Sequence, residues 1–410
     1  NFTRRVHDTV FPRFLELVEK MIRYLVNAHR CPLGIVACNA RGLASIARQP
    51  SASPTSAQAV VADVSNELME RRISVRTCGP LYRQWKQTKS WYRRAPEDGI
   101  EVDVPFVFTR RDDGGGAETR RPLAVLLHGA PGSYRDFSEN LIPRLFAEGV
   151  DVLAPSFPDL RFSIRNKFFW HSIEERTALL RDFLGQLGIT RIDALVAHSA
   201  ATFLSLRILL ERQEPVPTVK SLVLLAPNSH ITPSVLKPRW LKSWMAESYR
   251  KEILRPLVKA IILSSCYLGL TPVKPDVDNA MLSLITYSKS GYREGDKLLE
   301  AVARMKLPTL VAISRNDRLL SYSLFVEVCA VLGASEGDMW HFDGDGRMLR
   351  SDDTKESCIV FSQPRMKRRK LDSWLKVLNF EKGSHYPFVR HPDICADEII
   401  QLLQRKPPSS

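Results

Sequence analysis

From about residue 100 onward, two patterns of apolar residues alternate along the chain. Short runs that are apolar at nearly every position are followed by longer segments in which apolar residues recur at helical spacing. The short runs cover residues 122–129, 150–156, 192–199, 219–227, 307–314 and 375–381. Strands of this kind are typical of parallel sheets that are covered by helices on both faces. The pattern therefore predicts an α/β fold with a doubly wound, mostly parallel sheet.

The segments between these runs carry helix signals. Residues 137–149 have apolar positions at helical spacing and end at a glycine, and residues 172–175, Ser-Ile-Glu-Glu, have the spacing of a capping box. Further helices are expected over residues 320–332 and 397–405. Residues 101–108 alternate between apolar and polar side chains, which predicts one more strand before the first apolar run.

Changes in this pattern divide the chain. Residues 1–62 are expected to be a disordered or targeting segment, and residues 63–99, where mixed charge resumes, a helical extension. Residues 100–410 then form the α/β domain. Within it, residues 229–305 have helical periodicity without strands, which predicts a helical insertion over one edge of the sheet. Residues 335–372 are a second, polar insertion.

The composition indicates which kinds of binding partner and which cellular compartment to expect. The chain has 59 Lys and Arg against 45 Asp and Glu, and the net charge of +14 favours anions and peripheral contact with anionic membrane surfaces. Its 7 Cys have no metal-ligand spacing, which predicts free thiols in a reducing, intracellular compartment and no metal site. No apolar run approaches the ~20 residues of a membrane-spanning helix. Residues 21–62 contain Arg and Ser but no Asp or Glu, as mitochondrial transit peptides do; a basic tail on a cytoplasmic protein is the alternative.

Three side chains with complementary chemistry each stand directly after a predicted strand: Ser199, Asp317 and His385. The carboxyl ends of parallel strands meet at one edge of a sheet, so these side chains are expected to lie close together. A serine hydroxyl needs a histidine to take its proton, and the histidine needs a carboxylate to fix its tautomer. The sequence thus predicts Ser199 as nucleophile, His385 as base and Asp317 as acid.

Two turns complete this prediction. Residues 197–201, Ala-His-Ser-Ala-Ala, are a relaxed form of the G-x-S-x-G turn that exposes a nucleophile between a strand and a helix. The turn at residues 128–132, His-Gly-Ala-Pro-Gly, follows an earlier strand and lets the backbone approach closely. The backbone N–H groups of Ala200, Gly129 and Ala130 are expected to form an oxyanion hole.

The chain order of the three residues, the serine turn and the His-Gly turn resemble the α/β-hydrolase superfamily over residues 102–405. The H-G-A-P-G-S opening and the layout are also similar to a group of poorly characterised nematode α/β-hydrolases. The resemblance implies a serine hydrolase of carboxylic esters or thioesters, with a helical cap at residues 229–305 and no cofactor. The chain departs from the superfamily in having Ala at both small positions of the serine turn, no glycine-rich turn at residues 157–162, and a long insertion between acid and histidine.

The cap insertion is expected to decide the substrate. Trp240, Trp244 and Tyr267 supply aromatic surface that is expected to line a pocket over Ser199, which favours a small, hydrophobic ester or acyl compound. Nucleic acid is not expected as a partner, because no recognition motif accompanies the basic charge, and the run of Lys and Arg at residues 364–370 is typical of a solvated loop. The sequence leaves the oligomeric state open.

Three alternatives stay open. The fold could serve as a catalytically silent binding or regulatory module, since alanine accepts a strained backbone less readily than glycine. Acyl transfer to an acceptor other than water would use the same residues. An aspartate nucleophile, as in epoxide and haloalkane hydrolases with a similar His-Gly-x-Pro-Gly turn, is disfavoured by the serine. His128 and His198 are expected to be structural, and Asn228 to be a poorer orienting group than Asp317.

Overall fold

The computed structural model describes residues 69–110, 121–211, 216–232, 239–267, 276–291, 294–349 and 373–404. The chain divides into two compact units, Asn1–Ala52 and Ser53–Ser410, and all of these residues belong to the second. The predicted N-terminal segment, residues 1–62, and the basic run at residues 364–370 lie outside the described residues. No helix within the described ranges has the length and the apolarity to cross a membrane.

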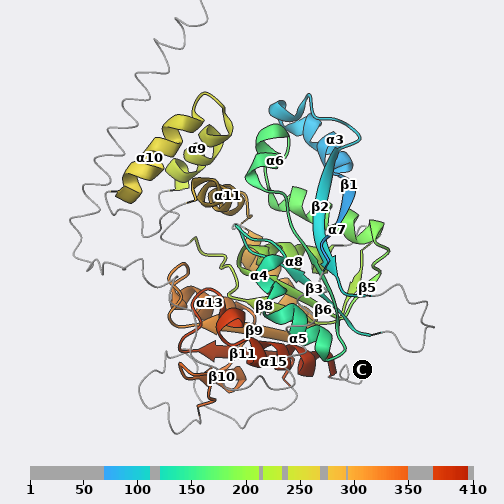
Figure 1. The fold of residues 1–410 in the computed structure, drawn as a ribbon, viewed down its shortest axis with the longest axis vertical. Coiled ribbons are helices and arrows are strands. Elements are labelled where there is room, and N and C mark those ends of the chain that lie inside the picture. The colour runs from blue at the N-terminus through green and yellow to red at the C-terminus, as the bar shows by residue number, and fades with distance from the viewer. Residues whose placement is uncertain are drawn as a thin grey trace, which may run out of the picture. The chain divides into compact units, whose positions relative to one another are not determined.

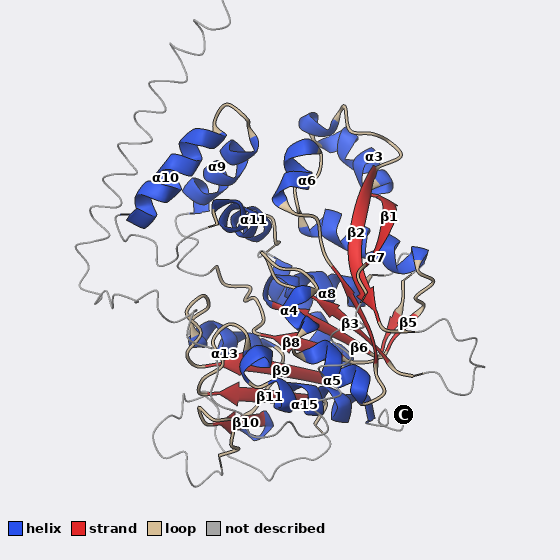
Figure 2. Cartoon of the chain, viewed as in Figure 1, coloured by secondary structure: helices blue, strands red, loops and turns tan. Residues whose placement is uncertain are grey.

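A nine-stranded sheet organises the described residues (Figures 1 and 2). Its spatial order is β1-β2-β4-β3-β6-β8-β9-β11-β10. β2 pairs antiparallel with β1 and β4, and the remaining neighbours are parallel. The strands are β1 (Arg71–Thr77), β2 (Ile100–Phe108), β3 (Leu123–Leu127), β4 (Asp151–Pro155), β6 (Ala194–His198), β8 (Leu222–Leu225), β9 (Thr309–Ser314), β10 (Met339–Phe342) and β11 (Leu375–Phe380), with β5 (Arg191–Ile192) and β7 (Thr218–Val219) forming a small separate sheet.

The inner parallel strands are buried along their whole length. Every residue of β3, β4, β6, β8, β9 and β11 is buried, in agreement with their continuous apolar runs. β2 differs, because buried and exposed residues alternate over its first half. These observations confirm the predicted doubly wound, mostly parallel sheet, whose carboxyl ends lie at one edge.

Helices cover both faces of the sheet. One core cluster combines strand residues with α7, α8 and α13, and the other combines strand residues with α4, α5, α14 and α15. The capping box predicted at residues 172–175 is present at the start of α7, because Ser172 and Glu175 each bind the other's backbone N–H. The bounds are α4 (Arg135–Ser138), α5 (Leu141–Ala147), α7 (Ile173–Gln186), α8 (Thr202–Leu210), α13 (Tyr322–Val331), α14 (Pro387–Arg390) and α15 (Pro392–Gln404).

The described part of the predicted insertion at residues 229–305 consists of helices joined by turns and loops. It contains α9 (Arg239–Arg250), α10 (Arg255–Tyr267), α11 (Val277–Ser288) and α12 (Gly295–Met305). α9 packs against α10 and α11, while α12 packs against α8 of the sheet domain. Figure 1 shows α9, α10 and α11 grouped together, and Figure 2 shows all three as helices. We call this helical insertion the cap.

Two other segments differ from the sequence prediction. The extension at residues 63–99 was expected to be helical, but its described part begins with strand β1 before α3 (Gly79–Thr88). The sequence of β1, RRISVRT, buries few of its side chains, as befits an edge strand, so its apolar pattern is weak. The polar insertion at residues 335–372 likewise begins with a short helix, η6 (Glu336–Asp338), and the edge strand β10.

Candidate active site

Ser199 lies where the central strand β6 turns into a helix. It opens the 3-10 helix η3 (Ser199–Ala201), which continues directly into α8. Its backbone φ is 50°, a left-handed conformation that non-glycine residues rarely adopt, and the residue is only 2% exposed. This strained strand-turn-helix corner is the geometry of a nucleophile elbow.

The two alanines of this turn have ordinary backbone conformations. Ala197 is part of β6, and Ala201 has a φ of −79°, so the positive φ falls on Ser199 alone. Both alanines are completely buried, which explains why small side chains are needed there. The replacement of glycine by alanine, treated above as a weakness of the turn, therefore imposes no backbone strain.

His385 joins Ser199 to Asp317. Its Nε2 lies 2.7 Å from Ser199 Oγ, and its Nδ1 lies 2.7 Å from Asp317 Oδ2. A carboxylate only accepts hydrogen bonds, so Nδ1 carries a proton and donates it to Asp317, and the lone pair of Nε2 faces the serine hydroxyl. The side chains of His385 and Asp317 are 7% and 0% exposed. The structure thus brings together all three residues predicted from the sequence.

The loops after β9 and β11 fix the acid and the histidine. Asp317 Oδ1 accepts the backbone N–H groups of Leu319 and Leu320 at 2.7 and 3.0 Å, so its second oxygen is free to bind His385. The neighbouring Asn316 Oδ1 accepts the N–H groups of Gly383 and Ser384 at 2.9 and 2.8 Å. The acid loop therefore holds the histidine loop directly, although β9 and β11 are far apart in sequence.

His198 holds the backbone of His385. Its Nε2 donates to the carbonyl oxygen of His385 at 3.0 Å, and its ring packs against the rings of Tyr386 and Phe388. Burial moves the pKa of His198 well below its ordinary value, so the ring is neutral at physiological pH. The expectation that His198 is structural agrees with this contact, but the sequence alone did not indicate that it positions the histidine.

The His-Gly turn packs against the serine. His128 Nδ1 donates to the Gly129 carbonyl at 2.7 Å, and its Nε2 accepts the N–H of Phe157 at 2.9 Å. Burial lowers the pKa of His128 to about 3, which keeps this tautomer neutral. A Cβ placed on Gly129 would lie 3.1 Å from His198 Nδ1 and 3.2 Å from the Cβ of Ser199, so the close approach of the two turns favours glycine.

A tyrosine from the cap reaches the nucleophile. The Tyr287 hydroxyl of α11 lies 3.1 Å from Ser199 Oγ. Since the serine hydroxyl donates to His385, the tyrosine hydroxyl is the donor in this contact. On the same helix, Ser283 donates to the carbonyl of Ala130 in the His-Gly turn at 3.0 Å. Sequence analysis missed both residues, because a single tyrosine or serine in a cap helix carries no recognisable signal.

Two of the three aromatic residues predicted to line a pocket over Ser199 are described by the structure. Trp240 and Trp244 are on α9, and Trp240 is 51% exposed. Neither makes a hydrogen bond or ring contact with the triad within the described part of the chain. Tyr267 ends α10, and its side chain lies outside the described residues. The cap residue in contact with Ser199 is instead Tyr287.

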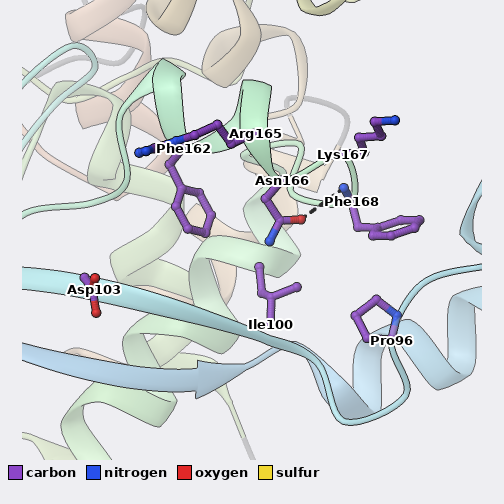
Figure 3. Close-up of a pocket in the computed structure, with 8 residues that line it drawn as sticks. All are labelled: Pro96, Ile100, Asp103, Phe162, Arg165, Asn166, Lys167 and Phe168. Carbon is purple, nitrogen blue, oxygen red and sulfur yellow. Dashed lines mark hydrogen bonds between the residues drawn. The ribbon is translucent and has the colours of Figure 1, made fainter.

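A groove of about 600 Å³ is present between β2 and the segment that follows β4 (Figure 3). Ile100 and Asp103 line it from β2, and Phe162 and Arg165 line it from α6 (Leu160–Arg165). Figure 3 also shows Asn166 in this wall, where its side-chain oxygen accepts a hydrogen bond from the backbone N–H of Phe168. No triad residue lines the groove, so it is separate from the serine centre.

Several solved structures are similar to the chain at low sequence identity. A search of solved structures found similarity to an esterase from Exiguobacterium antarcticum (14% identity, TM-score 0.43, 74% of this chain and 96% of that chain). A thermophilic esterase from Thermogutta terrifontis is similar at 12% identity and TM-score 0.47, over 82% of this chain and 98% of that one. A haloalkane dehalogenase from Bradyrhizobium elkani is similar at 15% identity and TM-score 0.44, over 73% and 94%.

Among curated protein sequences no match was found, so the closer similarity to nematode enzymes stays a prediction. The model of the alpha/beta hydrolase family matches residues 124–398, which is more than half of the 410 residues. That range includes the sheet from β3 to β11, the cap and the three residues Ser199, Asp317 and His385. The chain has the α/β-hydrolase fold and belongs to the alpha/beta hydrolase family.

Proposed function

We propose that this protein is a serine hydrolase that cleaves a carboxylic ester or thioester through an acyl-enzyme on Ser199. The observation that carries the proposal is the continuous pair of 2.7 Å hydrogen bonds from Ser199 through His385 to Asp317. A hydroxyl, an imidazole and a carboxylate in this arrangement are the parts needed to activate a serine. The buried, strained position of Ser199 at the elbow supports the same role.

In the first half of the reaction, Ser199 Oγ attacks the carbonyl carbon of the substrate while His385 Nε2 takes the hydroxyl proton. The imidazolium that forms is stabilised by the carboxylate of Asp317, which already binds Nδ1. The tetrahedral intermediate then collapses, the bond to the leaving alcohol or thiol breaks, and His385 returns the proton to the leaving group. The acyl group remains as an ester on Ser199.

The negative oxygen of the intermediate needs hydrogen-bond donors in fixed positions. The N–H of Ala200 is at the start of η3, where helix geometry leaves N–H groups without an acceptor in the helix. The second donor is proposed to come from the Gly129–Ala130 turn. His128 binds the Gly129 carbonyl, and because the C=O and N–H of one peptide unit point in opposite directions, this bond also fixes the N–H of Ala130.

In the second half, His385 takes a proton from water, and the hydroxide attacks the acyl carbon. The carboxylic acid leaves as the proton returns to Ser199 Oγ, which restores the starting state. Transfer of the acyl group to an alcohol instead of water would follow the same steps. Analysis of the products formed with a competing alcohol distinguishes the two reactions.

Labelling by a fluorophosphonate probe tests the proposal. The wild-type protein is expected to be labelled at Ser199, and Ser199→Ala is expected to abolish labelling. Ser205→Ala is the matched control, because Ser205 is equally buried on the adjacent helix α8, and its hydroxyl hydrogen-bonds, among the described residues, only to the backbone carbonyl of Thr202. Absence of labelling in wild-type protein with a normal melting transition would overturn the proposal and favour a non-catalytic binding module.

A further inference from the structure

A buried arginine near the serine centre has no hydrogen-bond or ion-pair partner among the described residues. Arg176 lies in the first turns of α7, directly after the capping box, and is only 3% exposed. Within the part of the chain that the structure describes, its guanidinium makes no hydrogen bond and no ion pair. It makes a cation–π contact with the ring of Phe157, whose centre lies 4.7 Å away. Buried arginines are ordinarily paired, so this isolation needs an explanation.

The surroundings of Arg176 belong to the proposed active site. The backbone N–H of Phe157 donates to His128, the residue that fixes the Gly129 carbonyl. On the cap side, Arg176 is close enough to Tyr287 for each group to influence the pKa of the other, and the hydroxyl of Tyr287 lies 3.1 Å from Ser199 Oγ. Arg176 therefore lies near both the His-Gly turn (residues 128–132) and Tyr287, the cap residue that contacts Ser199.

No carboxylate in the described part of the chain pairs with the charge of Arg176. Burial lowers the pKa of Arg176 to about 10, which still leaves the guanidinium protonated at neutral pH. The start of α7 adds the partial positive charge of a helix N-terminus. His171, also buried nearby, has an Nε2 without a partner in the described residues, and burial, together with the charges of Arg176 and Arg250, lowers the pKa of its ring and keeps it neutral. The buried carboxylate at this helix start, Glu175, is already bound by the backbone N–H groups of Trp170 and Ser172 and by the hydroxyls of Tyr82 and Tyr92. The guanidinium of Arg176 thus keeps donors for a carboxylate from outside the protein.

We propose that Arg176 binds a carboxylate group of the substrate, so that the preferred substrates are esters or thioesters carrying a second, ionised carboxyl group. This inference rests on the proposed hydrolase function and makes its substrate class specific. A guanidinium presents two parallel N–H donors that match the two oxygens of a carboxylate. The ligand would supply the negative charge that the fold leaves out, and would orient the ester relative to Ser199.

Selectivity between matched substrates is the first test. We define the selectivity ratio as kcat/KM for 4-nitrophenyl hemiglutarate divided by kcat/KM for its methyl ester, which differs only in lacking the charge. The wild-type ratio is expected to be at least about 10, and Arg176→Met is expected to lower it roughly 10- to 100-fold, the value of charge-assisted hydrogen bonds. The same ratio is measured for the acetate ester of 4-hydroxybutyrate and its methyl ester, which places the carboxylate on the alcohol side.

Arg181→Met is the matched control, because Arg181 lies on the same helix and the substitution removes the same charge. Its guanidinium pairs with the adjacent Asp182, and its side chain is 17% exposed. It is expected to leave both selectivity ratios unchanged. A wild-type ratio near 1 in both series, or equal loss of the ratio in the two variants, would overturn the carboxylate site.

Binding to an inactive variant separates this inference from the hydrolase proposal. In Ser199→Ala protein, calorimetry is expected to detect glutarate but not neutral glutaramide, and adding Arg176→Met is expected to weaken glutarate binding roughly 10- to 100-fold. If the Ser199→Ala variant binds glutarate but the wild-type protein is not labelled by the fluorophosphonate probe, the anion site is retained and the hydrolase is rejected. Labelling and ester hydrolysis with equal binding of glutarate and glutaramide would retain the hydrolase and reject the anion site.

Discussion

Two buried cations in this molecule are treated in opposite ways. Lys376, on the inner strand β11, is 5% exposed, and its Nζ lies 2.6 and 2.5 Å from the two carboxylate oxygens of Glu398 on α15. The same Nζ lies 3.4 Å from the centre of the Trp340 ring. Arg176 is equally buried but has no carboxylate partner among the described residues.

The difference separates scaffold from site. A charge buried for the sake of the fold is neutralised by the fold, because an unpaired buried ion costs several kcal/mol. A charge that the fold leaves unpaired beside a nucleophile is available to a ligand. The same contrast extends to two polar atoms near the turns of the site, His171 Nε2 and Asp136 Oδ2, which are buried without a partner in the described part of the chain. Each prediction below changes a residue of either the site or the scaffold and so tests this difference.

The largest effect is expected from removing the charge of the acid in the site. Asp317→Asn keeps the shape of the side chain but offers an amide where His385 needs a carboxylate, so the histidine loses both its tautomer and its stabilising charge. On the order of a 10⁴-fold loss of kcat is expected for ester hydrolysis. The melting temperature should change little, and Asp159→Asn, which alters only the N-cap of α6, serves as the control. A loss below tenfold would remove Asp317 from the mechanism.

The next largest effect is on stability. Lys376→Met leaves the Glu398 carboxylate buried without its partner, and we expect the free energy of unfolding to fall by about 3–5 kcal/mol. Arg176→Met removes a charge that has no partner, so its free energy of unfolding should stay the same or rise. Urea denaturation of both variants measures the difference. Equal destabilisation would mean that Arg176 is a structural residue like Lys376.

Sequence patterns predicted the parts of the fold that repeat. The buried parallel strands appeared as continuous apolar runs, and Ser199, Asp317 and His385 could be placed because each directly follows such a run. Periodicity and strand order carry this information, since the carboxyl ends of parallel strands necessarily meet. Strand β1 was missed for the same reason, because an edge strand with few buried side chains has little apolar pattern.

The remaining parts of the site depend on packing between distant segments. The contact of Tyr287 with Ser199 requires the cap to return over the sheet, and no local pattern encodes that return. The isolation of Arg176 is a property of everything around it, and at position 176 of the sequence it is indistinguishable from a helix arginine in solvent. For Ala197 and Ala201 the sequence suggested a backbone strain that the structure does not contain. The positive φ of the turn falls on Ser199, and the sequence does not reveal which residue carries it.

A smaller effect should appear in the response to acid on the Arg176 side. Burial lowers the pKa of His171 to about 3, so below pH 6.5 the unfolded chain binds a proton that the native protein does not. Stability is therefore lost as pH falls, by about 2 kcal/mol between pH 7 and pH 5 from this residue. His171→Asn, which also tolerates the left-handed backbone at this position, should reduce the loss by that amount. Urea denaturation at both pH values checks this, and an unchanged slope would contradict it.

The smallest effect concerns Asp136, a buried carboxylate of α4. Burial raises the pKa of Asp136 to about 6, so between pH 4 and pH 6 the native side chain keeps a proton that the unfolded chain has released. This residue therefore lowers stability as pH rises through that window. Asp136→Asn removes the penalty, and after allowance for partial exposure we expect a gain of about 1–2 kcal/mol at pH 7.5.

The gain from Asp136→Asn should vanish at pH 4, where the wild-type carboxyl is itself neutral in the native state. Urea denaturation of both proteins at pH 4, 5, 6 and 7.5 measures its growth, and Asp393→Asn on the exposed start of α15 is the control for a general change of charge. A gain independent of pH would trace to packing instead. A pH-dependent gain would identify a second uncompensated charge near the serine turn, of the opposite sign to Arg176. The site would then be destabilised by both signs of charge, whereas the scaffold pairs its Lys376 with Glu398.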